Sequence, residues 1–167
     1  MSGSKMSGSN TARAGLLLLA SLCLSGNAAQ AENSPFTAMA GTWSGGGVLS
    51  TSDGGQERLR CRASYDVGRA GAALHLNLRC ASASYNFDLA SDVQYRGGEI
   101  SGDWTEATRN ASGTLSGRAA GGHIDAAATS PNFSAGLSLT TRGNKQSVSI
   151  RPQGSDITGV TLALNRQ

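Results

Sequence analysis

The sequence is poor in proline, aromatic residues and cysteine, and each shortage narrows the possible classes of protein. Three prolines among 167 residues exclude a proline-rich or collagen-like chain, although glycine is abundant at 23 residues. The eight aromatic residues are two tryptophans, three tyrosines and three phenylalanines, whereas alanine, serine and threonine are common. We therefore expect an interior lined mainly by small side chains.

The first 31 residues have the pattern of a secretory signal peptide. Lys5 and Arg13 precede an apolar run at 16–24, and the segment 29–31 is Ala-Gln-Ala. We expect cleavage near Ala31 and a periplasmic or secreted protein of 136 residues, enough for one core. Its net charge falls from +3 to +1 because two basic residues leave and all 11 acidic residues stay. No later apolar run approaches the roughly 18 residues of a membrane-spanning helix.

Two cysteines remain after this segment, because Cys23 lies inside the apolar run. An even pair in an exported domain predicts a disulfide between Cys61 and Cys80, not a metal site or a catalytic thiol. Apolar residues occupy odd positions at 59–67 and even positions at 74–80, which predicts two half-buried strands. If Cys61 faces Cys80, the apolar faces of the two strands coincide and Ala70-Gly71 falls at the turn of a hairpin.

The same alternation with period two continues along the chain and predicts an all-β fold. It recurs at 85–95 and, after the Gly97-Gly98 turn, at 100–104, whereas a helical period is confined to a short turn near 35–40. Further candidate strands are 42–50, 113–119, 123–129, 132–141, 146–151 and 156–166. We expect an antiparallel meander of about eight or nine strands. Such a meander removes its exposed edges by forming a small closed or partly open barrel.

A short pattern, glycine-x-apolar-serine-glycine, occurs at 41–45, 98–102 and 113–117. Two glycines on the same face as one large side chain favour strong local curvature of a strand. We interpret the pattern as strand geometry and not as a binding motif. The expected organisation is a signal peptide at 1–31, an N-terminal arm at 32–40 and one barrel domain at 41–167.

Two residues near the ends of the predicted barrel carry a resemblance to a known group. Gly41-x-Trp43 opens the first strand, and Arg166 in the last strand shares the parity of its apolar residues. This resembles the calycins, the lipocalin-like barrels, in which such a tryptophan packs against an arginine and seals one end of the barrel. The lipocalin Thr-Asp-Tyr type of second motif is absent here. The resemblance implies an apolar ligand at the other end, without a cofactor. The inward aromatic residues that would contact it are Trp43, Tyr65, Tyr85, Phe87 and Trp104.

A second resemblance is to the small bacterial protease-inhibitor barrels, which share an Ala-Gly-x-Trp start and one disulfide. Their free N-terminal arm enters the active site of the target enzyme. In this chain residues 32–39 would be that arm. The resemblance therefore implies an alternative function, binding to a protein partner such as a protease.

Four arginines form one concentrated positive patch on the polar face of the predicted hairpin. Arg62 lies directly opposite Arg79, which costs stability unless an anion or a carboxylate intervenes. Either a phosphate, lipopolysaccharide or anionic headgroup binds there, or nearby carboxylates neutralise the patch. Nucleic-acid binding is not expected, because the tyrosines and phenylalanine of this region have the buried parity. The arginines are Arg58, Arg60, Arg62 and Arg79, and the carboxylates are Glu57, Asp88 and Asp92.

Catalysis and metal binding receive little support from the sequence. Ser64, Asp66 and His75 share one strand face, but a flat face supplies neither an oxyanion hole nor a pocket. His123 and Asp125 lack a third ligand. We expect a binding protein, not an enzyme, that holds a lipid or other small apolar ligand in the cell envelope.

Overall fold

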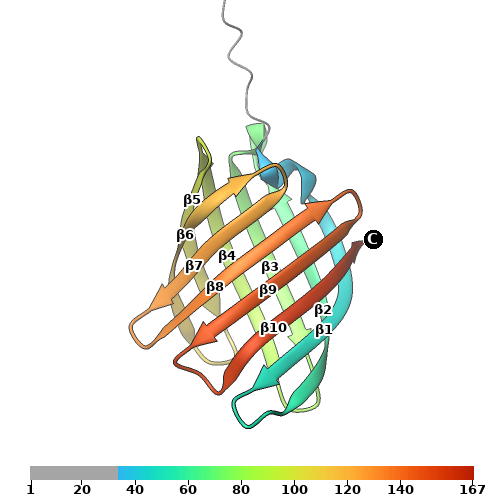
Figure 1. Ribbon diagram of the computed structural model, residues 1–167. Helices are drawn as coiled ribbons and strands as arrows, with labels where there is room; N and C mark the ends of the chain where they lie inside the picture. The colour runs from blue at the N-terminus through green and yellow to red at the C-terminus, as the bar shows by residue number, and fades with distance from the viewer. Residues whose placement is uncertain (1–33) are drawn as a thin grey trace, which may run out of the picture. The chain divides into compact units, whose positions relative to one another are not determined.

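Ten antiparallel strands form a closed barrel in the computed structural model, which describes residues 34–167 (Figure 1). The predicted signal peptide at 1–31 and the first two residues of the predicted arm lie outside these residues. The strands are β1 (Gly41–Thr51), β2 (Gln56–Val67), β3 (Ala73–Ala81), β4 (Asn86–Arg96), β5 (Glu99–Glu106), β6 (Ala111–Ala120), β7 (His123–Ser130), β8 (Phe133–Arg142), β9 (Lys145–Gln153) and β10 (Ile157–Arg166). Two short 3₁₀ helices, η1 (Pro35–Ala38) and η2 (Arg69–Gly71), precede β1 and β3.

The all-β antiparallel meander is confirmed, with one correction to the number of strands. Each strand pairs with the next one along the chain, and β1 pairs with β10, so that the described barrel has no unpaired edge. The expected count of eight or nine was too low, because every candidate segment forms a strand of its own. No helix in the described part of the chain is long and apolar enough to span a membrane.

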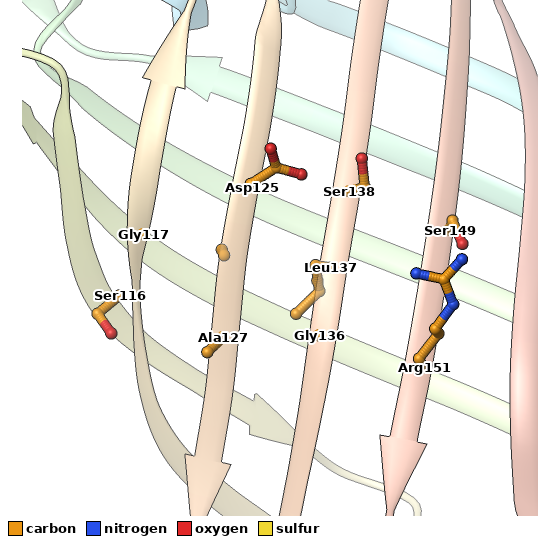
Figure 2. A pocket seen from close by; sticks show the side chains of 10 residues that line it. Ser116, Gly117, Asp125, Ala127, Gly136, Leu137, Ser138, Ser149 and Arg151 are labelled. Atoms are coloured by element: carbon orange, nitrogen blue, oxygen red, sulfur yellow. The ribbon is translucent and has the colours of Figure 1, made fainter.

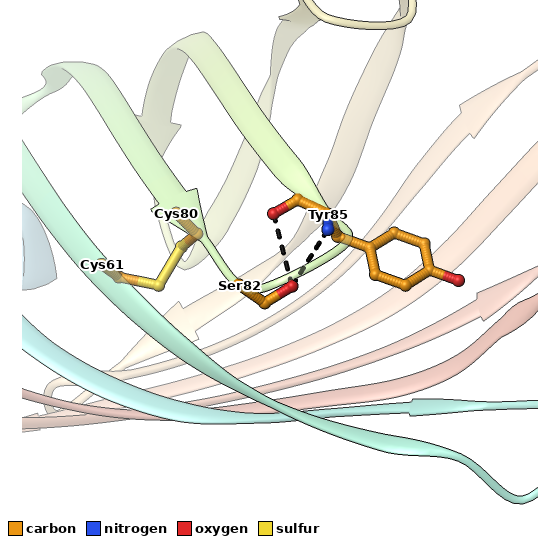
Figure 3. The surroundings of a disulfide bond; sticks show 4 residues. All are labelled: Cys61, Cys80, Ser82 and Tyr85. Carbon is orange, nitrogen blue, oxygen red and sulfur yellow. Dashed lines mark hydrogen bonds between the residues drawn. A yellow bond between two sulfur atoms is a disulfide. The ribbon is translucent and has the colours of Figure 1, made fainter.

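The hairpin of β2 and β3 has the predicted register. Cys61 lies opposite Cys80 and forms the disulfide with it (Figure 3). The turn contains Ala70 and Gly71, whose φ angles of 66° and 73° lie in the left-handed region. A single register therefore brings together the two cysteines, the apolar faces and the turn.

The two ends of the barrel differ. At the end where β1 begins, which we call the cap end, η1 covers the interior and Phe36 is completely buried. The Phe36 ring packs edge-on against Tyr95, with 6.1 Å between ring centroids. The opposite end, which we call the distal end, carries the turns that leave β1, β3, β5, β7 and β9.

The glycine pattern permits a close approach between neighbouring strands. A Cβ atom built at Gly45 would lie 2.1 Å from the backbone oxygen of Ala163, and one built at Gly117 would lie 2.1 Å from that of Asp125. Any side chain at either position would push the neighbouring strand away. The glycine-x-apolar-serine-glycine pattern thus serves strand geometry, because its glycines allow the backbones of neighbouring strands to come into contact.

A buried carboxylate holds the turn between β5 and β6. Glu106 accepts hydrogen bonds from the backbone N–H of Asp88, Thr108 and Arg109 at 2.9, 3.2 and 2.9 Å. The Thr108 hydroxyl also donates to it at 2.7 Å, and the Arg109 guanidinium lies 3.5 Å away. Burial opposes ionisation of Glu106, but these hydrogen bonds outweigh it and lower the pKa of the carboxyl below its ordinary value.

We predict that replacing both Cys61 and Cys80 with alanine lowers the free energy of unfolding by about 3 kcal/mol, because the disulfide closes a loop of about 20 residues. Chemical denaturation of the oxidised protein and of the variant measures this difference. The reduced native protein serves as the control and is expected to resemble the variant. Equal denaturation midpoints for the oxidised protein and the variant would contradict the prediction.

We predict that Glu106→Gln destabilises the protein by about 2 kcal/mol at neutral pH, because hydrogen bonds to a charged acceptor are lost. The folded state lowers the pKa of Glu106, so the carboxylate stabilises the fold above the ordinary carboxyl pKa. This stability disappears as the pH falls through the lowered pKa. Denaturation curves recorded across the acidic range should therefore converge for the two proteins at low pH, and a constant difference would show that ionisation of Glu106 is irrelevant.

Candidate functional site

At the cap end, the side chains of Trp43 and Arg166 close the barrel. The two residues are partners in the register of β1 and β10, and the guanidinium carbon lies 4.4 Å from the centroid of the Trp43 ring. Trp43 Nε1 donates a hydrogen bond to the Met39 carbonyl at 2.7 Å, and Arg166 donates to the carbonyls of Ala38 and Ala40. The pair thus attaches the segment before β1 to the barrel.

A chain of polar groups crosses the interior below this seal. The Tyr65 hydroxyl donates to Gln146 Oε1 at 2.7 Å, and Gln146 Nε2 donates to the Thr141 hydroxyl at 3.1 Å. Burial raises the pKa of the Tyr65 phenol above its ordinary value, so the phenol remains a neutral donor. These buried groups bond to one another, and among the described residues no buried side-chain nitrogen or oxygen lacks a hydrogen-bond partner.

Farther from the cap, the inner wall retains accessible apolar surface. Six aliphatic side chains lie within long strands, pack against the core and are nevertheless half-buried. An inward side chain of this kind keeps accessible surface only where space lies in front of it, since filled interiors are close-packed. The six residues come from opposite walls of the barrel, β3 on one side and β6, β8 and β9 on the other (Figure 1). This lumen lining comprises Leu76, Leu78, Leu115, Leu139, Val148 and Ile150.

At the distal end, a group of aromatic and charged residues borders the lumen lining. The rings of Tyr85 and Phe87 are stacked with 6.4 Å between centroids, and the Arg109 guanidinium lies 4.7 Å from the centroid of Phe87. The Tyr85 hydroxyl donates to Asp156 at 2.8 Å, which links the β3–β4 turn to the β9–β10 turn. This hydrogen bond raises the pKa of Tyr85 and lowers that of Asp156.

The β3–β4 turn holds Tyr85 in this position. The Ser82 hydroxyl accepts a hydrogen bond from the Tyr85 N–H at 3.0 Å, as Figure 3 shows beside the disulfide. Glu57 accepts hydrogen bonds from the Ser82 hydroxyl and the Ser84 N–H at 2.6 and 3.0 Å. The bond from Ser82 is the main reason why the pKa of Glu57 is lowered. Glu57 is thereby committed to this turn.

The five aromatic residues that the sequence singled out do not meet in one place. Trp43 and Tyr65 are buried together at the cap end with 6.5 Å between ring centroids. Tyr85 and Phe87 lie half-buried at the distal end. Trp104 is buried against Phe133, and its Nε1 donates to the Thr114 carbonyl at 3.2 Å. The prediction from the sequence selected aromatic residues and overlooked the aliphatic lumen lining. Both groups occupy the inward-facing alternate positions of their strands.

The arginine patch lies on the outer face of the barrel, separate from the lumen lining. Arg62 faces Arg79 in the register of β2 and β3, and Arg79 forms an ion pair with Asp88 at 3.2 Å. Asp92 instead contacts His75, with 2.7 Å between Oδ1 and Nδ1. Of the three carboxylates considered from the sequence, Asp88 alone contacts the patch, through Arg79.

Neither suspected polar constellation forms a reactive centre. His75 lies opposite Asp66 in the register, but its ring bonds to Asp92 on the exposed outer wall. The ring is therefore not positioned to act as a base on the Ser64 hydroxyl. His123 contacts Asp125 and the Thr140 hydroxyl, each at 2.9 Å. Among residues 34–167 no group of three histidine, cysteine or acidic side chains is placed to hold a metal ion.

A shallow hollow of about 390 Å³ lies on the outer wall of β6 to β9 (Figure 2). It exists because small side chains face outward there, including Ser116, Ala127 and Ser138, and because Gly136 has no side chain. Figure 2 shows Arg151 at one side of this hollow. The hollow is open to solvent and shallow, and its one carboxylate, Asp125, is already bonded to His123. We therefore regard the lumen lining as the better candidate for a binding site.

Comparison with known proteins supports the architecture. No protein-family model and no curated protein sequence matches the chain. The structure of Rv2717c from M. tuberculosis is similar with a TM-score of 0.63 at 12% identity, over 78% of this chain and 94% of that chain. The S-type phycobiliprotein lyase CPES from Guillardia theta is similar with a TM-score of 0.56 at 9% identity, over 79% and 90%. Together with the closed ten-stranded barrel, these likenesses show a calycin-like fold.

We predict that Arg166→Gln lowers the free energy of unfolding by about 2 kcal/mol, since it removes the contact with Trp43 and the hydrogen bonds to two carbonyls. Urea denaturation followed by tryptophan fluorescence measures the change. Arg142→Gln, which removes an exposed arginine at the end of β8, is the matched control and should leave stability nearly unchanged. Equal effects of the two substitutions would show that the cap does not depend on Arg166.

Proposed function

We propose that the protein binds a small apolar ligand, such as the acyl chain of a lipid, inside the barrel. The observation that carries this proposal is the half-buried aliphatic lining on opposite walls of the lumen. Each methylene group transferred from water to such a lining contributes about 0.8 kcal/mol. A long hydrocarbon chain would therefore gain more than a polar ligand of the same size.

The chemistry of the interior supports an apolar ligand over a charged one. The buried groups Tyr65, Gln146 and Thr141 bond to one another, so each of them already has a partner within the protein. Arg109 and Asp156, which contact the Phe87 ring and the Tyr85 hydroxyl, are charged groups at the distal end. Because η1 fills the cap end, a ligand would enter from the distal end, past Tyr85 and Phe87.

We further propose that the protein acts after export, in the periplasm or outside the cell. Two observations support this location. Residues 1–31 have the sequence pattern of a signal peptide, and the disulfide between Cys61 and Cys80 is typical of oxidising compartments. The role is binding without catalysis, in keeping with an aliphatic lumen lining that offers no nucleophile or general base.

The alternative function, inhibition of a protease through residues 32–39, has less support. Its mechanism requires an arm that is free to enter another protein. In the described part of this segment Phe36 and Met39 are buried, and Trp43 and Arg166 bond to the backbone between 38 and 40. Insertion into a protease would first require these contacts at the cap to break.

We predict that a dansyl-labelled fatty acid binds the protein with enhanced fluorescence, and that Ala126→Trp weakens this binding at least tenfold. Ala126 is half-buried and faces the interior beside the lumen lining, so an indole there would occupy the space of the ligand. Fluorescence titration, followed by displacement with unlabelled fatty acid, measures the affinity.

The neighbouring residue provides a matched control for this experiment. Ala127 is exposed and lines the outer hollow, so Ala127→Trp makes the same change on the opposite face of β7 and should leave the affinity unchanged. Circular dichroism would verify that both variants are folded. The proposal fails if the native protein does not bind the probe, or if the two variants bind it equally.

A further inference from the structure

We infer that the outer face formed by β2, β1 and β10 docks on an anionic membrane surface. Its principal feature is the arginine row, which we define as Arg58, Arg60 and Arg62. These residues occupy alternate positions of β2, so their side chains leave the same face at intervals of about 7 Å. This inference goes beyond ligand binding in the lumen and does not depend on it.

The arginine row has no partner among the described residues. All three side chains are exposed, and none of them forms a hydrogen bond or an ion pair with residues 34–167. Arg79, the fourth member of the predicted patch, is already paired with Asp88. The carboxylates that could have neutralised the row are bonded elsewhere, Glu57 to the β3–β4 turn and Asp92 to His75. The charge of the row therefore remains available to an external anion.

The strands of this face carry few acidic residues. The carboxylates of the bordering turns are bonded elsewhere, Asp53 within the β1–β2 turn and Asp156 to Tyr85. Strands β8, β9, β10 and β1 contain no aspartate or glutamate. They are consecutive in the barrel, and β1 pairs with β2. Asp66, toward the cap end of β2, is the outward carboxylate closest along the strand to the row. An anionic surface could approach β2, β1 and β10 together without meeting a carboxylate on the middle of any of these strands.

The residues beside the row are small, which makes the face accessible to a flat partner. Gly46 on β1 lies between Arg60 on β2 and Ala163 on β10 in the two registers. Val48, next to Arg58, is the one large apolar residue that is exposed among the described residues, at 36%. This combination suits a bilayer surface. The guanidinium groups would contact the lipid phosphates, and the apolar side chain would reach the boundary of the acyl chains.

The same features favour a membrane over a single-stranded nucleic acid. Proteins that bind single strands provide exposed aromatic rings on which the bases stack. On this face the aromatic residues of β1 and β2, Trp43 and Tyr65, point inward and are buried. The face therefore offers charge without a stacking surface.

The test is sedimentation of the protein with vesicles made of equal parts phosphatidylcholine and phosphatidylglycerol, compared with vesicles of phosphatidylcholine alone, at low ionic strength. We expect binding to the anionic vesicles and release by added salt. Replacing all three residues of the arginine row with serine should weaken partitioning on the order of a hundredfold, about fivefold for each arginine. The three single variants, each expected to show the fivefold effect, keep the test valid should the triple variant fold poorly.

A matched control removes the same charge from elsewhere. Arg96, Arg118 and Arg142 are exposed at the cap ends of β4, β6 and β8, and their replacement with serine should change partitioning only slightly. The inference would be overturned if the protein did not bind anionic vesicles or bound neutral vesicles equally well. It would also be overturned if both triple variants lost the same amount of binding. Binding to a single-stranded oligonucleotide without binding to vesicles would overturn it in favour of nucleic acid. None of these outcomes depends on whether the lumen binds a fatty acid.

Discussion

The pairing of β1 with β10 is the constraint on which the rest of the structure depends. It joins the two ends of a meander whose other strand pairings are between successive strands, and it brings Trp43 next to Arg166. From that position Arg166 reaches the backbone before β1 and holds the cap over one end of the barrel. Closure therefore decides three things together: no strand edge remains for aggregation, an inside separates from an outside, and the cap end differs from the distal end.

Small side chains are the physical reason why the interior retains space. Glycines such as Gly45 and Gly117 let neighbouring backbones approach so closely that no side chain fits at these positions. A wall built in this way supplies few atoms to fill the centre of the barrel and correspondingly little apolar burial. The disulfide and the hydrogen-bonded Glu106 compensate near the distal end, which no helix of residues 34–167 covers. A partly filled lumen and local covalent reinforcement are thus two consequences of the same composition.

The hairpin and the candidate site were not equally predictable from the sequence. The register of β2 and β3 could be predicted completely, because the alternation, the turn at Ala70-Gly71 and the two cysteines impose the same pairing. For the site, parity correctly placed Trp43, Tyr65 and Trp104 inside but could not distribute the aromatic residues along the barrel axis. Trp43 proved to belong to the cap, whereas Phe87 lies at the far end. Aliphatic residues such as Leu139 carried the same signal and were overlooked because they had no distinguishing chemistry.

The sequence by itself determined the face of the sheet on which each residue lies, since side chains alternate strictly along a strand and this alternation does not depend on the rest of the fold. It also determined the pairing of neighbouring strands wherever a short turn connects them. The tertiary structure alone decided which residues from distant strands meet across the lumen, and which carboxylate each arginine reaches. The sequence shows the arginines of β2 as a cluster, but only the structure shows that they have no partner within residues 34–167, because Glu57 and Asp92 bond elsewhere. Such relations depend on the closure of the barrel, which sets the distance between residues far apart in the chain.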